Sequence, residues 1–146
     1  MIGDGKGPSS ALQQPLKSLS LLVVVAGTLL LAACTQPSEE ERLRKMGLPP
    51  ADFVADVREG KKLFEANCAV CHGKKATGSM QGPPLVHKVY NPSHHSDLAF
   101  FRAVKDGSRA HHWNFGDMPA QPQVSPEQAG HIVGYVRKIQ RSAGIK

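Results

Sequence analysis

Two cysteines and a histidine in one short run are the residues of this sequence with the clearest chemical potential. Cys68, Cys71 and His72 form a C-x-x-C-H motif. Two thiols separated by two residues can reach the two vinyl groups on one side of a porphyrin and form thioethers. The residue after the second cysteine then lies against the ring face, where an imidazole nitrogen can bind iron. The spacing therefore predicts covalent attachment of one haem c through this motif.

A C-x-x-C pair is compatible with two other functions. A thioredoxin-like redox motif belongs to a βαβ pattern, and the sequence shows no such pattern. A structural zinc site needs four ligands, usually from two cysteine pairs. The chain has no second pair, although its seven histidines could supply the remainder. Haem attachment is the favoured interpretation and zinc is the alternative.

The second axial position of such an iron has several candidates. Met118 lies in a Gly-Asp-Met-Pro loop just ahead of a C-terminal helix, which lets the chain return on the opposite face of the ring. Met80 follows the motif closely, and Met46 precedes it in a segment that reads as a linker. His111 or His112 could bind instead and lower the potential, whereas an open site would permit chemistry. We expect Met118 to be the ligand.

Length and composition limit the class of protein. A chain of 146 residues suits one domain, and 18 Lys+Arg against 12 Asp+Glu give a charge of +6. With 21% charged and 40% hydrophobic residues, neither a disordered tail nor a multi-span membrane protein fits. Aromatic residues make up only 5%, which predicts a thin core that something else has to fill. No basic aromatic platform is present, so nucleic acid is not an expected partner.

The N-terminal segment has the features of an export signal. Residues 19–33 carry no charge and follow Lys6 and Lys17. This run is shorter than the roughly 20 apolar residues of a permanent membrane anchor, and it fits a secretory signal. Its Leu-Ala-Ala exit into Cys34 resembles a bacterial lipoprotein signal, which implies cleavage before Cys34 and a diacylglycerol on its sulfur. An ordinary secretory signal or an uncleaved anchor is the alternative.

The sequence therefore divides into three parts. Residues 1–33 are a signal peptide that is removed, residues 34–51 are the lipidated cysteine with a flexible linker, and residues 52–146 are the folded domain. The linker is expected because residues 35–41 lack apolar side chains. A diacylated Cys34 would tether the domain firmly to a membrane. The domain would then lie outside the cytoplasm, on the periplasmic face if the envelope has two membranes.

Local signals predict three helices and no strand in the folded domain. The first begins after Asp56 and ends near Asn67. The second begins after Ser96 and stops at Gly107. The third begins after Ser125, where a proline takes the first helical position and a glutamine completes a capping box. Apolar residues recur at helical spacing most clearly in the third.

Over roughly residues 56–140 the order of these features resembles that of the class I cytochromes c, which are monohaem electron carriers. In that family C-x-x-C-H is followed by a G-P-x-L segment, a middle helix, a Met-Pro loop and a last helix. The resemblance implies that the Pro83 carbonyl accepts the proximal imidazole N–H and that Leu85 packs against the haem. It also implies that Met118 is the sixth iron ligand.

The same resemblance implies a fold. We expect an all-α small cytochrome c fold, with three main helices and long loops wrapped around one covalently attached haem. In the family the first and last helices cross at a small residue and aromatic side chains. Gly60, Phe64 and Tyr135 match those positions.

The expected function is that of an electron carrier rather than an enzyme. A membrane-tethered monohaem cytochrome would pass single electrons between extracytoplasmic redox proteins, such as a dehydrogenase, an oxidase or a cytochrome complex. Lys74 and Lys75 could steer docking to an acidic partner. A haem enzyme or gas sensor with an open or displaceable sixth ligand is the rival hypothesis.

Other histidines crowd the middle of the domain. His87, His94 and His95 could form a surface copper or zinc site, or they could simply be exposed. His111 and His112 could alternatively be surface residues or, with Trp113 and Arg109, donors to the haem propionates.

Overall fold

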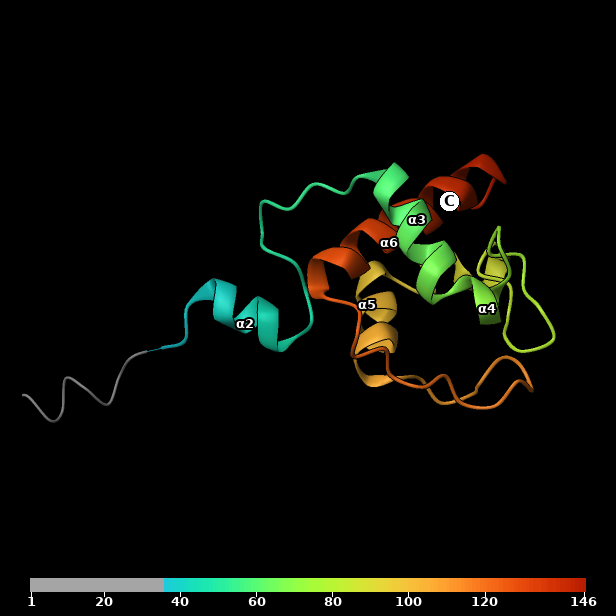
Figure 1. The fold of residues 1–146 in the computed structure, drawn as a ribbon, viewed down its shortest axis with the longest axis horizontal. Helices are drawn as coiled ribbons and strands as arrows, with labels where there is room; N and C mark the ends of the chain where they lie inside the picture. The colour runs from blue at the N-terminus through green and yellow to red at the C-terminus, as the bar shows by residue number, and fades with distance from the viewer. Residues whose placement is uncertain (1–35) are drawn as a thin grey trace, which may run out of the picture. The chain divides into compact units, whose positions relative to one another are not determined.

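All regular secondary structure in residues 36–146, which the computed structural model describes, is helical. In chain order the elements are α2 (Glu39–Lys45), α3 (Val57–Asn67), α4 (Ala69–His72), the 3-10 helix η1 (Lys88–Tyr90), α5 (Asp97–Asp106) and α6 (Pro126–Ser142) (Figure 1). An isolated antiparallel bridge joins Ser108 and Met118. The prediction of an all-α fold is confirmed for this part of the chain.

Side-chain caps explain where α3 and α6 begin. The Asp56 carboxylate accepts a hydrogen bond of 2.8 Å from the Arg58 backbone N–H. At α6 the Ser125 hydroxyl accepts from the Gln128 N–H at 3.2 Å, and the Gln128 side chain accepts from the Ser125 N–H at 2.9 Å. This reciprocal pair is a capping box. Both predicted helix starts are confirmed.

Close packing of α3 against α6 forms the main core of the domain (Figure 1). Gly60 lies where the two helices cross, and a Cβ at this position would overlap the backbone carbonyl of His131. Beside it the Phe64 and Tyr135 rings lie 5.5 Å apart, centre to centre. Phe64 is fully buried in a cluster that includes Val136. The predicted crossing at a small residue and two aromatics is confirmed.

A second, smaller core joins α5 to α6. Phe101 of α5 packs with Ala129 and Val133 of α6, and Leu48 covers the same cluster. As predicted, α5 begins after Ser96 and ends at a glycine. Leu48 shows that the segment before residue 52 already contacts the folded domain.

A flexible linker is predicted over residues 34–51, but in the structure the compact unit already begins at Ser38, inside that range. Helix α2 forms where an unstructured tether was expected. The Ser38 hydroxyl accepts from the Glu41 N–H at 3.1 Å, and the Glu41 carboxylate lies 3.6 Å from the Lys45 ammonium one turn later. Three acidic residues in the first turn and basic residues in the last also suit the helix dipole. Caps and charges therefore form this helix without an apolar stripe.

The predicted signal peptide and Cys34 lie outside the described residues. Within residues 36–146, no helix is both long enough and apolar enough to cross a membrane.

Candidate functional site

A cavity of about 360 Å³ brings together residues that lie far apart in the sequence. Its lining includes Cys68, His72, Pro83, Leu85 and Met118. Apolar side chains of the three long helices form much of the rest: Phe64, Phe100, Val104, Ile132, Val133 and Val136. All the predicted haem-binding residues that lie within residues 36–146 are in this lining except Cys71, the second cysteine of the motif.

His72 ends the short helix α4 and is 8% exposed. Its Nδ1–H donates a hydrogen bond of 2.9 Å to the Pro83 carbonyl oxygen, so the predicted bond is present. Burial lowers the pKa of His72, an effect that the bond to Pro83 partly opposes. The ring is therefore neutral near pH 7, and Nε2 carries the free lone pair that a metal ligand needs.

The Pro83–Leu85 wall of the cavity is fastened to the loop that follows α4. The Ala76 carbonyl accepts from the Leu85 and Val86 N–H groups at 2.8 and 2.9 Å. Ala76 is fully buried and has a φ of 56°, a conformation that L-residues adopt rarely. These bonds fix the wall relative to the histidine that it contacts.

The environment of Cys68 disfavours the alternative functions of the motif. Burial, reinforced by the neighbouring Cys71, raises the pKa of the Cys68 thiol to about 11. Reactive C-x-x-C thiols have lowered pKa values instead. Within residues 36–146, no histidine or carboxylate completes a three-ligand group with either cysteine. The geometry thus supports neither a thioredoxin-like nor a zinc-binding function.

Backbone pairing holds Met118 at the cavity. The Ser108 N–H donates to the Met118 carbonyl at 2.9 Å, and the Met118 N–H donates to the Ser108 carbonyl at 2.8 Å. Gly107, at the end of α5, has a φ of 81°, and a Cβ there would lie 2.6 Å from the Met118 carbonyl oxygen. A glycine is therefore required both for the turn and for the close approach.

The other candidate ligands are placed differently. Met80 is 94% exposed and does not line the cavity, which removes it as a candidate. Met46, also exposed, follows helix α2 and is likewise absent from the lining. His111 and His112 do line the cavity, so their geometry leaves that alternative open.

Trp113 adds an unpaired donor to the cavity lining. Among the buried side-chain nitrogen and oxygen atoms of residues 36–146, its Nε1 is the one without a partner at full hydrogen-bond geometry, although Trp113 lies near enough to the Tyr90 hydroxyl to lower the pKa of that group. A buried N–H normally has an acceptor, because leaving it unpaired costs about 1–3 kcal/mol. This donor suits an acceptor group carried by a molecule in the cavity.

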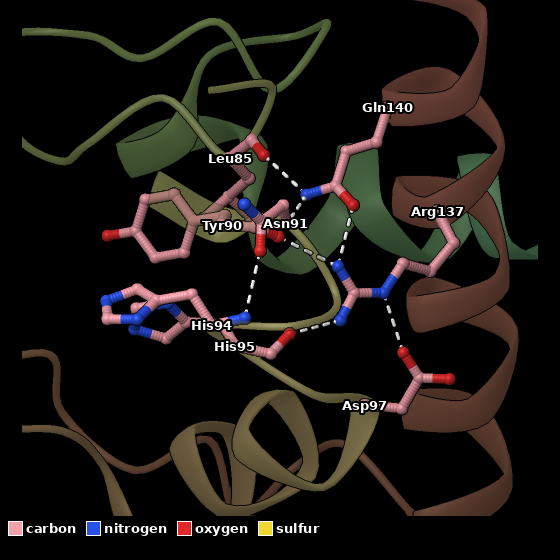
Figure 2. Close-up of polar contacts among 8 residues, drawn as sticks. All are labelled: Leu85, Tyr90, Asn91, His94, His95, Asp97, Arg137 and Gln140. Atoms are coloured by element: carbon pink, nitrogen blue, oxygen red, sulfur yellow. Dashed lines mark hydrogen bonds and ion pairs between the residues drawn. The ribbon is translucent and has the colours of Figure 1, made fainter. Parts of the chain in front are cut away.

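A buried arginine that the sequence analysis missed connects α6 to the turn after η1. Arg137 donates from Nε to the Asp97 carboxylate at 2.6 Å and from Nη1 to the Tyr90 carbonyl at 2.8 Å (Figure 2). Its Nη2 donates to the His95 carbonyl. The guanidinium also lies over the Phe100 ring, 4.6 Å from its centre. One side chain thus fixes the segment between η1 and α5.

Gln140, one turn further along α6, completes this network. Its Oε1 accepts from Arg137 at 2.7 Å, and its Nε2 donates to the carbonyls of Leu85 at 2.7 Å and Tyr90 at 3.0 Å (Figure 2). The sequence contains a signal for this pair, because Arg137 and Gln140 are polar residues three apart on the apolar side of the helix. Polar residues at such positions indicate buried hydrogen bonds.

Comparison with known proteins identifies the family. No solved structure matches the chain significantly. A family model described as Cytochrome c matches residues 57–140, which is more than half of the 146 residues. Proteins of this family bind haem c through a cysteine pair and are typically electron carriers rather than enzymes. Cys68 and Cys71 fit the family's C-x-x-C-H motif, and the chain belongs to the cytochrome c family.

Proposed function

We propose that this cytochrome is a membrane-tethered monohaem protein that carries single electrons between redox proteins outside the cytoplasm. One observation supports it above the others: Cys68, His72 and Met118 line the same cavity although the last lies on a distant loop. Haem c in this cavity would supply a reversible one-electron Fe(III)/Fe(II) couple.

The residues at the cavity fit a haem. Cys68 and Cys71 have the spacing for two thioethers, and the lining between the helices is largely apolar. The unpaired Trp113 Nε1 suits a propionate oxygen. His72 and Met118 are the two side chains that would bind iron, from α4 and from the loop after α5.

The protein's own contribution to electron transfer is to keep these two side chains in place. The Pro83 carbonyl fixes the ring orientation of His72, and the paired bonds with Ser108 hold Met118. Ligands held by surrounding hydrogen bonds move little when the charge on the iron changes. A small rearrangement on oxidation and reduction is what an electron carrier needs.

Visible spectra test this function. The purified protein should give a low-spin c-type spectrum in both oxidation states, with an iron–methionine charge-transfer band when oxidised and no response of the reduced form to carbon monoxide. Met118→Ala should lose that band and bind carbon monoxide. Met80→Ala is the matched control and should behave as wild type, because Met80 is 94% exposed and lies away from the cavity.

Other spectra would overturn the proposal in defined ways. A high-spin wild-type spectrum, or prompt carbon monoxide binding, would favour the haem enzyme or gas sensor. A low-spin spectrum that lacks the methionine band and is unchanged in Met118→Ala would assign the ligand to His111 or His112.

The membrane tether rests on the sequence of residues 19–33 and on Cys34. Cells fed a labelled fatty acid should label the wild-type protein, and the label should be absent from Cys34→Ser. Haem stain on a denaturing gel serves as the control, because the thioethers to Cys68 and Cys71 remain in any exported variant. Wild-type protein that carries haem but no lipid would refute the lipid tether and leave the electron carrier intact.

The proposed partners are redox proteins with an acidic docking face. Lys74 and Lys75 are exposed directly after α4, close in sequence to the proposed iron ligand. Their substitution by glutamate should slow electron transfer to the host's membrane oxidase at low salt, with less effect at high salt. Lys138→Glu, at an exposed position of α6, should slow it less. Equal effects of the three substitutions would contradict docking at this face.

A further inference from the structure

Four histidines from two loops gather at the edge of the cavity. His94 and His95 precede α5, and His111 and His112 lie in the loop after it. His94 and His112 are exposed, so the cluster is open to solvent. The predicted surface site included the first pair only, together with His87. The structure replaces His87 by the second pair.

The ring nitrogens of these histidines lie at metal-ligand spacing. Nε2 of His94 is 3.2 Å from Nε2 of His112, and Nε2 of His95 is 3.4 Å from Nε2 of His111. One nitrogen from each of His94, His95 and His112 lies within 4.8 Å of the other two. A tetrahedral zinc site with Zn–N distances of about 2.0–2.1 Å places its ligand nitrogens about 3.3 Å apart.

Hydrogen bonds to the backbone set the tautomer of two of the rings. Nδ1–H of His95 donates to the Val89 carbonyl at 2.8 Å, and Nδ1–H of His111 donates to the Arg109 carbonyl at 2.7 Å. In the neutral form both rings therefore present a lone pair at Nε2. Two lone pairs that face each other at 3.4 Å repel, and a cation beside them removes the repulsion.

We propose that this cluster binds one divalent transition-metal ion of the kind that imidazole prefers, with Zn²⁺ as the reference ion, through His94, His95 and His112. The fourth position is taken by water, with His111 next to it. The bonds from Nδ1 to carbonyl oxygens are the outer contacts that metal-ligating histidines usually make. The site shares no ligand with the proposed iron site.

Protonation of the histidine rings in this cluster is disfavoured. Burial, and then the neighbouring His94, His111 and Arg137, lower the pKa of His95, against the effect of its bond to Val89. Partial desolvation by the packed rings, and then the other three histidines, lower the pKa of the exposed His112 as well. Neutral rings are the form that binds a metal ion.

Hydrogen bonds within the protein hold the backbone on both sides in position. Arg137 holds the His95 carbonyl, and the Asn91 side chain accepts from the His94 N–H at 2.9 Å (Figure 2). In the other loop the Asp117 carboxylate accepts from the Ala110 N–H at 2.9 Å. An ion bound between the loops would join the turn before α5 to the loop that carries the proposed methionine ligand.

Zinc titration of the haem-loaded protein, purified without a polyhistidine tag, tests the proposal. Calorimetry should show one Zn²⁺ per chain, and zinc should raise Tm. His94→Gln and His112→Gln, one on each loop, should each weaken binding at least tenfold. His111→Gln should weaken it less. His87→Gln is the matched control and should bind as wild type, because His87 is outside the cluster.

Three results would overturn the proposal. They are no stoichiometric binding, unchanged binding in both His94→Gln and His112→Gln, or loss of the low-spin haem spectrum in His112→Gln, which would assign that histidine to the iron. The visible spectrum and circular dichroism of each variant, recorded before the titration, show whether it is folded. Because each loop supplies one test variant, misfolding of one still leaves the other to decide.

Discussion

The two walls of the cavity that carry the proposed iron ligands are built differently. His72 ends a helix, is 8% exposed and follows α3, which packs along α6. Met118 lies on a largely exposed loop, where two backbone bonds to Ser108 hold it. We call the side of the cavity that carries His72 the histidine wall and the side that carries Met118 the methionine wall. The histidine wall depends on the core of the whole domain, whereas the methionine wall depends on a few local contacts.

This difference predicts which substitutions act globally and which act locally. Segments with few buried apolar contacts open at a lower free energy than the packed core. Changes at the α3–α6 crossing should therefore reduce the stability of the whole domain together with haem binding. Changes in the loop should alter the methionine ligand while the helices remain folded. An electron carrier can adjust its potential on the loop without disturbing its fold.

The largest effect is expected at Gly60, where α3 and α6 cross. Gly60→Ala places a methyl group against the backbone carbonyl of His131, so the helices have to move apart. We expect a loss of about 3 kcal/mol or more in the free energy of unfolding, which lowers Tm by more than about 10 °C. Urea unfolding followed by circular dichroism measures it.

Lys61→Ala is the control for that substitution, because Lys61 is the exposed neighbour of Gly60 on α3. Its effect should stay within about 0.5 kcal/mol. A Gly60→Ala protein as stable as Lys61→Ala would show that the crossing is not the rigid part of the molecule.

The second largest effect is expected at Arg137. Arg137→Met keeps much of the side-chain volume but removes the donors to the Tyr90 and His95 carbonyls and to Gln140. The Asp97 side chain is 61% exposed, so solvent screens that ion pair, and the loss comes mainly from the buried Gln140 oxygen and the two part-buried carbonyls. We expect a decrease of about 2–4 kcal/mol in the free energy of unfolding, measured in urea.

Lys138→Met, at the exposed neighbouring position on α6, should change the free energy of unfolding by less than about 0.5 kcal/mol. If Arg137→Met were equally mild, the network would contribute no net stability. The turn before α5 would then be held by packing alone.

Local sequence signals were sufficient to predict where the helices of the histidine wall begin. The Asp56 and Ser125 side chains cap α3 and α6 by accepting hydrogen bonds from backbone N–H groups two or three positions later. The starts of both helices could therefore be predicted from neighbouring residues in the sequence. Ser38 with Glu41 is the same kind of signal for α2. Residues 35–41 carry no apolar side chains, however, and a segment of that composition predicts a linker rather than a helix.

Contacts between distant segments could not be predicted in this way. The histidine pairs at 94–95 and 111–112 are recognisable in the sequence, but α5 and its turns decide that they meet. The bonds of Arg137 likewise reach residues more than 40 positions away. The Pro83 contact with His72 was predicted only through resemblance to a family. No local rule brings a carbonyl to an imidazole 11 residues earlier in the chain.

A third, local effect is expected at the methionine wall. Gly107→Ala combines an unfavourable φ of 81° with a Cβ only 2.6 Å from the Met118 carbonyl oxygen. With a ψ of −179° this backbone lies in a region that is essentially restricted to glycine, so we expect a loss of about 1–3 kcal/mol for the backbone conformation alone. Displacement of Met118 should also weaken the iron–methionine band in the visible spectrum while the helix content is retained.

Gly116→Ala is the matched control in the same loop. Gly116 has a φ of 84°, but a Cβ there meets nothing within 4 Å. It should lose similar stability and keep the methionine band. If both variants lost the band equally, the backbone conformation of the loop would matter more than the contact at Gly107.

The smallest effect, at the start of α3, depends on pH. Hydrogen bonds from the backbone N–H groups of Arg58 and Glu59, together with the positive charge of Arg58, hold the pKa of Asp56 below 3.8, its usual value. Because the pKa is lower in the folded state, the ionised carboxylate stabilises the fold above the unfolded pKa. That contribution decreases as the pH falls through the folded pKa.

Asp56→Asn keeps an oxygen that can cap the helix but removes the charge. At pH 7 its Tm should be a few degrees below that of wild type, and the difference should shrink as the pH falls below about 4. Asp52→Asn, an exposed acidic position outside any helix, should show no comparable dependence. Acid also affects the haem ligands, but it does so equally in wild type, Asp56→Asn and Asp52→Asn. Comparing the three proteins therefore isolates the effect of the Asp56 charge. A difference that stayed constant down to pH 2 would mean that the amide geometry, rather than the charge, determines the start of α3.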